Sequence, residues 1–276
     1  MIMKNKVVVI TGAGGVLCST IAKGYAKEGA KVALLDLKLE SAQAVADEIV
    51  KAGGIAKAYA VNCLEKSTME EAREKINKDL GACDILVNGA GGNHPKGTTS
   101  AEYFNQADVD DESKISFFDL DEKGVDFVFK LNFLATFLTT QVFAKDKLGR
   151  GGIIINISSM NAFRPLTKSP AYSGAKASVS NFTQWLAVHF AGEGIRVNAI
   201  APGFFVTNQY RALLFDDKGN PTPRTKKILA GTPMNRFGEA EELLGTVMWL
   251  SDNDKSGFVT GIVVPIDGGF SAYSGV

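Results

Sequence analysis

Short apolar runs alternate along the chain with longer segments in which apolar residues recur every three or four positions. A short apolar run bounded by turn residues is typical of a buried strand, and the longer spacing is typical of a helix with one face against a core. The pattern predicts strands at 7–10, 31–35, 56–61, 84–87, 153–157, 195–200 and 259–264. It predicts helices at 16–28, 39–52, 67–80, 125–147, 171–191 and 239–251. Strands that alternate with helices indicate an α/β domain built on a parallel sheet.

Two long polar segments interrupt this alternation. Between residues 93 and 123 the apolar period disappears, and residues 208–233 are rich in proline, glycine and charges. A connection of this length in a compact domain is usually a lid, a binding loop or a mobile segment. We therefore expect a single domain over residues 1–276, with an insert-like loop at 93–123 and a substrate-loop region at 208–233.

The composition is typical of an ordinary soluble enzyme. Hydrophobic residues make up 45% of the 276 residues, enough to fill one large core. Thirty basic residues balance thirty acidic ones, so no net field favours nucleic acid or an anionic membrane. The three cysteines lie far apart with no C-x-x-C pattern, which argues against a metal site and against a disulfide framework. The sequence has no run of eighteen apolar residues and no leader-like N-terminus, so we expect a cytoplasmic protein that does not span a membrane.

The stretch from Ser159 to Lys176 carries the candidate chemistry. Tyr172 and Lys176 are four residues apart and so share one face of a helix, where the lysine charge favours the phenolate. A tyrosine ordinarily has a pKa of about 10, so an acid/base role at neutral pH needs such a neighbour. Ser159 follows a predicted buried strand, where it could hydrogen-bond a substrate oxygen. By itself, however, a Tyr-x-x-x-Lys spacing more often marks two residues on a helix surface.

A glycine-rich turn near the N-terminus is the candidate cofactor site. Gly12, Gly14 and Gly15 separate the first strand from the first helix, whose N-terminal N–H groups and dipole attract phosphate. The second strand ends in Asp36, where a carboxylate would bind an adenosine ribose and repel a 2′-phosphate. Asp36 therefore favours NAD over NADP, unless it is a helix N-cap or a loop acid. A second turn of small residues, 88–92, would let the cofactor lie against the backbone.

Together these motifs resemble the short-chain dehydrogenases/reductases over the whole chain. The order that carries the resemblance is Thr11-Gly12, Asp36, Asn88-Gly89-Ala90-Gly91, Asn132, Ser159, Tyr172, Lys176, Pro202-Gly203 and Asp267-Gly268-Gly269. The thirteen-residue step from Ser159 to Tyr172, followed by Lys176, is the most specific part. The resemblance implies a single-domain Rossmann fold, in which helices cover both faces of a doubly wound parallel sheet of seven strands in the order 3-2-1-4-5-6-7.

The resemblance also implies roles for individual residues. In the implied catalytic tetrad, Tyr172 is the general acid/base and Ser159 orients the substrate oxygen. Lys176 binds the nicotinamide ribose and lowers the tyrosine pKa, and Asn132 holds a water in a proton relay. The residues implied to bind NAD are Gly12, Gly14, Gly15, Val16, Leu17, Asp36, Asn62, Cys63, Asn88, Gly89, Ala90, Tyr172, Lys176, Pro202, Gly203, Phe205 and Thr207. In the family, helices matching 125–147 and 171–191 form dimer faces, so a homotetramer is expected.

The sequence departs from the family pattern in two places. The usual Gly-x-x-x-Gly-x-Gly would place glycines at Val16 and Cys18, so Gly14 and Gly15 would have to carry the tight turn instead. Gly89 replaces the second residue of the customary Asn-Asn, which removes one hydrogen-bonding side chain. Neither change removes an acid, a base or a ribose contact.

Within the family, three features resemble the short-chain-type D-mannonate oxidoreductases, also called fructuronate reductases. They are Gly-Gly-Val-Leu-Cys, Gly-Gly-Asn-His-Pro-Lys and the long segment before Asn132. The resemblance implies interconversion of D-mannonate and D-fructuronate with NAD(H). The residues expected to contact the sugar acid are Asn93, His94, Lys96, Ser159, Asn161, Arg164 and Tyr172. For His94, Lys96 and Arg164 the alternative is a solvent-facing or capping side chain.

Three other functions remain open on the sequence. A sugar or polyol dehydrogenase similar to gluconate 5-dehydrogenase, or a 3-oxoacyl reductase, would use the same chemistry on another substrate. A non-catalytic NAD-sensing protein would keep only the fold. The complete set of Asn132, Ser159, Tyr172 and Lys176 argues against a sensor, which would be free to lose its acid/base.

Overall fold

A seven-stranded parallel sheet forms the centre of the computed structural model, which describes residues 3–206, 214–217 and 219–275. The strand order is β3-β2-β1-β4-β5-β6-β7, which confirms the predicted fold. The strands are β1 (Val7–Thr11), β2 (Lys31–Asp36), β3 (Ile55–Ala60), β4 (Ile85–Asn88), β5 (Gly152–Ile157), β6 (Ile195–Pro202) and β7 (Val263–Ile266). The described helices are α1 (Val16–Lys27), α2 (Leu39–Lys51), α3 (Lys66–Asp79), α4 (Glu122–Phe129), α5 (Ala135–Phe143), α6 (Pro170–His189), α8 (Pro223–Ala230), α9 (Leu244–Ser251) and α10 (Asn253–Ser256).

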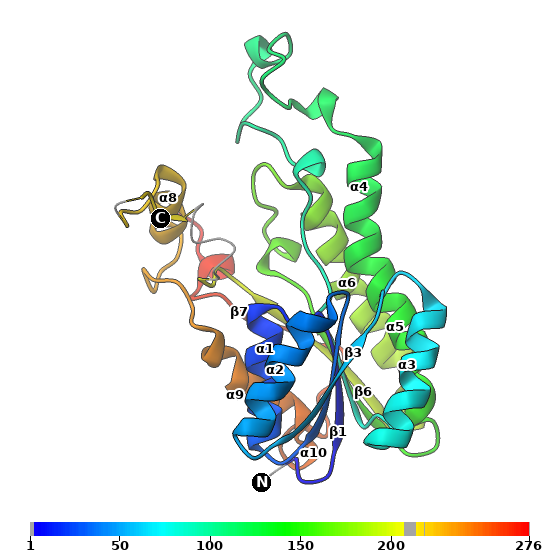
Figure 1. Cartoon of the computed structure of the whole chain (residues 1–276). Coiled ribbons are helices and arrows are strands. Elements are labelled where there is room, and N and C mark those ends of the chain that lie inside the picture. Colours follow the sequence, from blue (N-terminus) through cyan, green and yellow to red (C-terminus); the bar gives the residue numbers. More distant parts are fainter. Residues whose placement is uncertain (1–2, 207–213, 218, 276) are drawn as a thin grey trace.

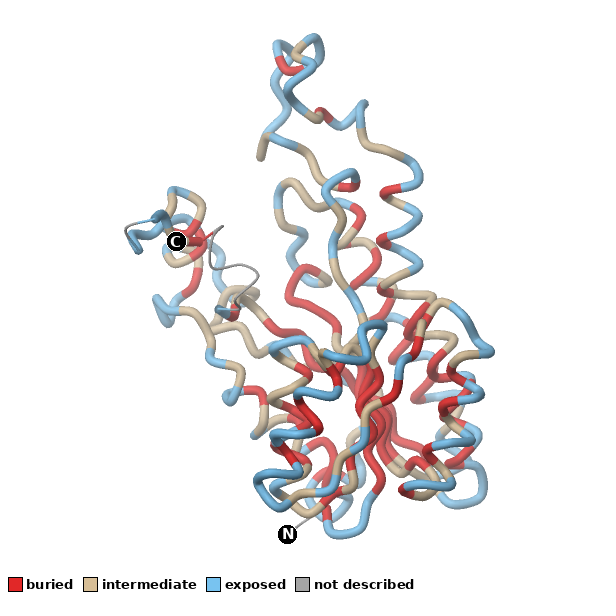
Figure 2. The backbone as a smooth tube through the Cα atoms, in the orientation of Figure 1, coloured by how far each residue is buried: buried red, intermediate tan, exposed pale blue. Residues whose placement is uncertain are grey.

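Helices cover both faces of the sheet (Figure 1). Successive side chains of a strand point to opposite faces, so Val8 and Ile10 of β1 pack with α1, α2 and α9, whereas Val7 and Val9 pack with α3, α5 and α6. All residues of β1 and β6 are buried because both faces are covered. Figure 2 shows the buried residues concentrated in this sheet and on the inner faces of its helices.

The strand order reverses between β1 and β4, and this reversal locates the candidate site. In open parallel sheets, ligands bind at the carboxyl ends of the strands beside such a switch point. The turns that follow β1, β2, β4, β5 and β6 contain most of the residues that the sequence singles out.

Residues 93–121 form an arm that projects from the body (Figures 1 and 2). Short 3-10 turns, including Pro95–Gly97 and Phe117–Asp119, interrupt it, and α4 follows directly. The arm is fixed by local polar bonds, since Ser116 and Asp119 form a reciprocal capping pair and Lys114 pairs with Asp108. Within the loop expected at 93–123, the structure has no strand or α-helix up to residue 121, and α4 begins at Glu122.

Two element predictions in the C-terminal half are wrong. Residues 208–233 were expected to be irregular, but α8 lies within them, because Pro223 occupies its first turn and the Thr222 hydroxyl caps the N–H of Thr225. The last strand is β7, which begins after most of the apolar run at 259–264. Gly261, with a φ of +82°, turns the chain before β7. Its N–H donates to the carbonyl of Val197 in β6.

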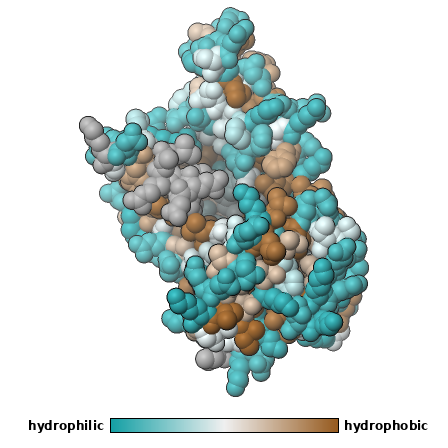
Figure 3. Space-filling model, in the orientation of Figure 1, coloured by the Kyte–Doolittle hydropathy of each residue, from teal (hydrophilic) through white to brown (hydrophobic). Residues whose placement is uncertain are grey.

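The helical run Glu122–Lys147 is long and apolar enough to cross a membrane by length and composition, although half of its most apolar window is buried in the fold. Within it, α4 packs on α6 and α5 packs on α3, so we interpret the run as a core helix. On the face drawn in Figure 3 the surface is mainly hydrophilic, with separate hydrophobic patches.

Candidate active site

The turn after β1 brings the start of α1 close to the turn after β4. Gly12 has a φ of +64°, and a Cβ on it would lie 3.0 Å from the Cα of Ala90. Gly15 is the N-cap of α1, which begins with Val16 and Leu17, and it makes no side-chain cap hydrogen bond. The first N–H groups of a helix have no partner within the helix and favour an anion.

Asp36 ends β2 beside this turn. One carboxylate oxygen accepts from the N–H of Gly14 at 3.0 Å, and the other accepts from the N–H of Lys38 at 3.0 Å. The N-cap of α2 is Lys38, so Asp36 is not the helix cap that the sequence left open. The main chain of Asp36 also accepts from the N–H of Val61 at 2.8 Å, which ties β2 to the segment after β3.

The segment after β3 contains Asn62 and Cys63. The Asn62 side chain accepts from the N–H of Leu64 at 3.1 Å and donates to Glu65 at 2.8 Å, so it is engaged in a local turn. Cys63 is buried, and burial raises the pKa of its thiol to about 11. All three cysteines are free and buried.

The turn after β4 is held from behind by polar side chains. Asn88 donates to Thr140 at 3.0 Å and to Asn156 at 2.8 Å, and it is almost fully buried. The N–H groups of Gly89 and Ala90 both donate to the Thr11 hydroxyl at 3.1 Å. The backbone of residues 89–91 is therefore fixed against β1.

Asn132 lies in a π-helical turn, Lys130–Leu134, between α4 and α5. Such turns are rare and occur frequently at functional sites. The Asn132 side chain accepts from the N–H of Gly92 at 3.1 Å. It donates to the carbonyls of Gly92 at 2.7 Å and Val128 at 2.8 Å. A Cβ on Gly91 would lie 2.7 Å from Asn132 Oδ1 and 3.1 Å from Lys176 Nζ, so Gly91 lets these two side chains approach.

Lys176 and Tyr172 extend from the N-terminal half of α6. Lys176 Nζ donates to the carbonyl of Ile157 at 2.8 Å and lies 5.7 Å from the centre of the Tyr172 ring. Lys176 is 4% exposed, and burial lowers the pKa of its ammonium group to about 8. A charge with little solvent beside a phenol favours the phenolate.

Ser159 follows β5 and begins a short 3-10 turn, Met160–Ala162. Its hydroxyl accepts from the N–H of Asn161 at 3.2 Å, and both residues are buried. The neighbouring Ser158 hydroxyl bonds to the carbonyl of Lys176 at 3.1 Å, which joins the end of β5 to α6.

The turn after β6 approaches the segment after β7. Gly203 donates to the carbonyl of Ile266 at 2.9 Å, and a Cβ on it would lie 2.6 Å from the Cα of Asp267. Pro202 ends β6. Phe205 is 8% exposed and packs against Gly238, so its ring belongs to the core. Thr207 lies outside the described residues.

The expected substrate residues have local partners and are not grouped around one point by the described contacts. His94 caps the turn Pro95–Gly97 by accepting from the N–H of Lys96 at 3.2 Å, and its ring packs edge-on against Phe127. Lys96 pairs with Asp121 at 3.3 Å. Arg164 Nε donates to the carbonyl of Ser271 at 3.2 Å. The His94 side chain therefore caps the turn at the base of the arm.

The Asn93 side chain donates to Thr98 at 3.2 Å and accepts from the N–H of His94 at 2.9 Å, which shapes the base of the arm. The arm also reaches α8, because Glu102 pairs with Lys227 at 2.7 Å and with Arg224 at 3.8 Å. The main-chain carbonyl of Lys168, a non-glycine residue with a φ of +75°, accepts from the N–H of Thr99 at 2.9 Å. The sequence carries no signal for these contacts, since Glu102 and Lys227 are 125 residues apart.

Residues 6–217 match the family model for short chain dehydrogenase. A protein from Haemophilus influenzae named as an uncharacterized oxidoreductase is 62% identical over 275 residues, covering 99% of this chain and 96% of the relative. A Bacillus subtilis protein, also named as an uncharacterized oxidoreductase, is 54% identical over 275 residues, covering 99% and 98%. The crystal structure of a proposed D-mannonate oxidoreductase from Haemophilus influenzae, with bound NAD, is similar with a TM-score of 0.95 at 61% identity, covering 99% of this chain and 97% of that chain.

Proposed function

The chain belongs to the short-chain dehydrogenase family, and on that premise we propose that it is an NAD(H)-dependent oxidoreductase that interconverts D-fructuronate and D-mannonate. The observation that carries the proposal is that Asn132 and Lys176 meet at Gly91 and that Lys176 Nζ lies 5.7 Å from the centre of the Tyr172 ring. Ser159 follows directly after β5. The similarity to a proposed D-mannonate oxidoreductase with bound NAD supports both the cofactor and the substrate class.

The described residues fit a dinucleotide. The N-terminus of α1, where Gly15 provides no side-chain cap, would hold a pyrophosphate, and Lys176 beside Gly91 would bind the nicotinamide ribose. Asp36 would bind an adenosine ribose without a 2′-phosphate. Bound NADH supplies a hydride to a ketone, and NAD accepts one from an alcohol. The remaining steps belong to the side chains of this chain.

In the proposed mechanism, Tyr172 donates the proton that turns the reduced ketone oxygen into a hydroxyl, and it accepts that proton in the reverse direction. The buried ammonium of Lys176 lowers the cost of the tyrosinate that donation leaves behind. Ser159 hydrogen-bonds the same substrate oxygen and holds it near Tyr172. Asn132 holds a water molecule in the chain of hydrogen bonds that returns a proton to Tyr172.

The substrate carboxylate needs a cation away from the reacting ketone. Arg164 remains the first candidate, because its described hydrogen bond uses only Nε and the two Nη groups can form a bidentate pair. Lys96 is a weaker candidate, since it is already paired with Asp121. Asn93, His94 and Asn161 complete the proposed sugar-acid site, which the arm and α8 would close against water.

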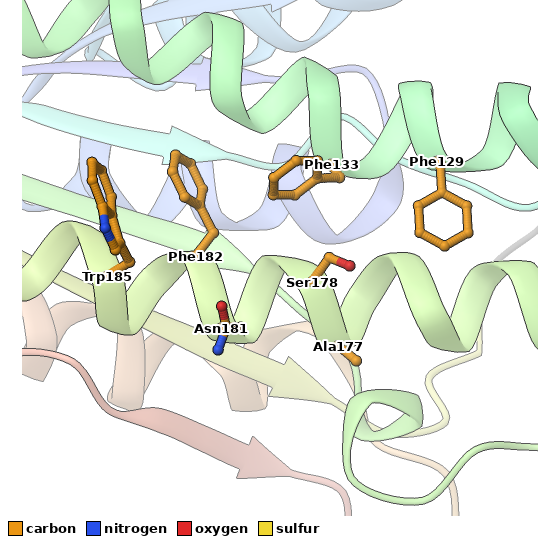
Figure 4. A pocket seen from close by; sticks show the side chains of 7 residues that line it. All are labelled: Phe129, Phe133, Ala177, Ser178, Asn181, Phe182 and Trp185. Carbon is orange, nitrogen blue, oxygen red and sulfur yellow. The ribbon is translucent and has the colours of Figure 1, made fainter.

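We propose that the protein assembles as a cytoplasmic homotetramer through the outer faces of α4, α5 and α6. A groove of about 610 Å³ lies there, apart from the site, lined by Phe129, Phe133, Ala177, Ser178, Asn181, Phe182 and Trp185 (Figure 4). Phe129 and Trp185 are exposed, which is costly for large apolar rings and favours a partner. Light scattering at micromolar concentration should give a tetramer. A monomer would contradict this assembly.

The test of the proposed function is a screen of NADH oxidation with D-fructuronate, 5-keto-D-gluconate, a neutral ketose and a 3-oxoacyl thioester. The highest kcat/KM should belong to fructuronate. Preference for 5-keto-D-gluconate or a neutral ketose would favour another sugar dehydrogenase, and preference for the thioester would favour an oxoacyl reductase. NADH binding without turnover of any of them would favour a sensor.

A further inference from the structure

Cys18 and Gly89 each belong to one of the two departures from the family pattern, and they contact each other. Gly89 follows β4, and Cys18 lies in the first turn of α1, where it is 5% exposed. A Cβ built on residue 89 would lie 2.2 Å from Cys18 Sγ. Atoms cannot approach so closely, so the thiol occupies the volume that a side chain at residue 89 would need.

The same turn is fixed by two further contacts. The Thr11 hydroxyl accepts from the N–H groups of Gly89 and Ala90, and Gly12 lies against the Cα of Ala90. Thr11, Gly12 and Cys18 thus form a continuous support on which residues 89–91 rest. Gly91, at the end of this stretch, borders Asn132 and Lys176.

We propose that Cys18 and Gly89 form a positioning pair: the thiol takes the place of a side chain at residue 89 and sets the spacing between the glycine-rich turn and residues 89–91. This inference depends on the proposed NAD(H) site, because the dinucleotide would lie against both the glycine-rich turn and residues 89–91. Packed interiors tolerate exchanges that conserve volume better than additions. A larger residue at 89 therefore requires a smaller one at 18.

The pair acts through volume and not through charge. Burial raises the pKa of the Cys18 thiol to about 12, so the thiol is neutral near pH 7 although Lys176 and Asp36 lie within electrostatic range. Cys18→Ala should therefore alter NADH affinity by the same factor at pH 6 and at pH 8.

The test is a double-mutant cycle with Gly89→Ala, Cys18→Gly and the double variant, in which the Kd of NADH is measured by its fluorescence and stability by urea unfolding. Coupled neighbours differ from additivity by about 2- to 100-fold. Gly89→Ala should raise the Kd more than about tenfold, and adding Cys18→Gly should recover most but not all of the loss. Recovery is incomplete because the added Cβ would also lie 2.8 Å from the Thr11 carbonyl oxygen.

Gly245→Ala is the matched control, since its Cβ would meet nothing within 4 Å, and it should leave the Kd unchanged. If Gly89→Ala does not fold, Cys18→Val tests the pair from the other side and should weaken NADH binding more than Cys18→Ala does. Additive effects on the Kd would overturn the positioning role, even if the stabilities are coupled. A wild-type protein that binds no NADH would overturn the proposed function as well, and so the two failures are distinct.

Discussion

Two groups of candidate residues are held by different kinds of contact. One group lies at the carboxyl ends of the strands, called the edge below, and the other lies on the surrounding surface loops, called the rim. At the edge, Asn132 and Lys176 are buried and held by hydrogen bonds to the main chain of Gly92 and Ile157. At the rim, Lys96 and Arg164 are exposed and held by contacts at the surface. A buried side chain with fixed partners can be held within about 0.5 Å of a productive geometry, whereas an exposed charged side chain is screened by solvent and held less precisely.

If the proposed roles hold, chemistry and substrate choice reside in separable parts of the molecule. Changes at the sheet edge should affect turnover of every substrate, and changes at the rim should affect only substrates with a carboxylate.

Tyr172→Phe removes the proposed proton donor. General acid/base groups contribute about 10²–10⁴-fold, so kcat should fall by that factor for fructuronate and for a neutral ketose alike, with NADH affinity nearly unchanged. Steady-state kinetics and NADH fluorescence measure the two effects. Tyr103→Phe, on the exposed arm, is the matched control and should keep wild-type turnover. Near-normal turnover of Tyr172→Phe would remove this residue from the mechanism.

Lys176 should make the stability of the cofactor-free protein depend on pH. Its folded pKa of about 8 lies below its ordinary value of 10.5, so the buried charge is a penalty below pH 8 that disappears as the pH rises to 10.5. The wild type should gain up to about 3 kcal/mol over this window relative to Lys176→Met. The free energy of unfolding of both proteins is measured in urea at each pH. The difference between the two values removes the contribution of titratable groups that both proteins share. Parallel curves would show that Lys176 is not buried as a charge.

Arg164→Ala tests the rim. Hydrogen bonds to charged groups contribute about 1.5–3 kcal/mol, so the KM for fructuronate should rise by about 10- to 100-fold. The KM for a neutral ketose should change little. Lys96→Ala is the matched control, because its ammonium is already paired with Asp121, and a change below about threefold is expected. Equal increases in the KM for charged and neutral substrates would contradict the separation between edge and rim.

Asp36→Asn tests cofactor choice alone. Removing the carboxylate removes its repulsion of a 2′-phosphate, which should improve kcat/KM for NADPH relative to NADH by about tenfold. The preference among sugar substrates should stay the same. An unchanged cofactor ratio would indicate that Asp36 serves only to hold Gly14 and Lys38.

The two regions also differ in how far the sequence predicts them. The sequence predicts β1, β2, β4, β5 and β6 within a few residues, because burial on both faces leaves continuous apolar runs. At the rim, α8 was missed because its short segment has a proline start and few apolar residues, and β7 was displaced by the turn at Gly261. The pairing of Glu102 with α8 and the contact of Cys18 with Gly89 join residues remote in sequence, and only the fold brings them together.

Absorbance of NADH during turnover of D-fructuronate by the wild-type protein, compared with NADPH and with a neutral ketose, tests the proposed reaction. We expect rapid oxidation of NADH, slower oxidation of NADPH, and a kcat/KM for the neutral ketose at least tenfold lower, roughly the contribution of one charged hydrogen bond. The absence of fructuronate-dependent NADH oxidation, at protein concentrations that bind NADH, would contradict it.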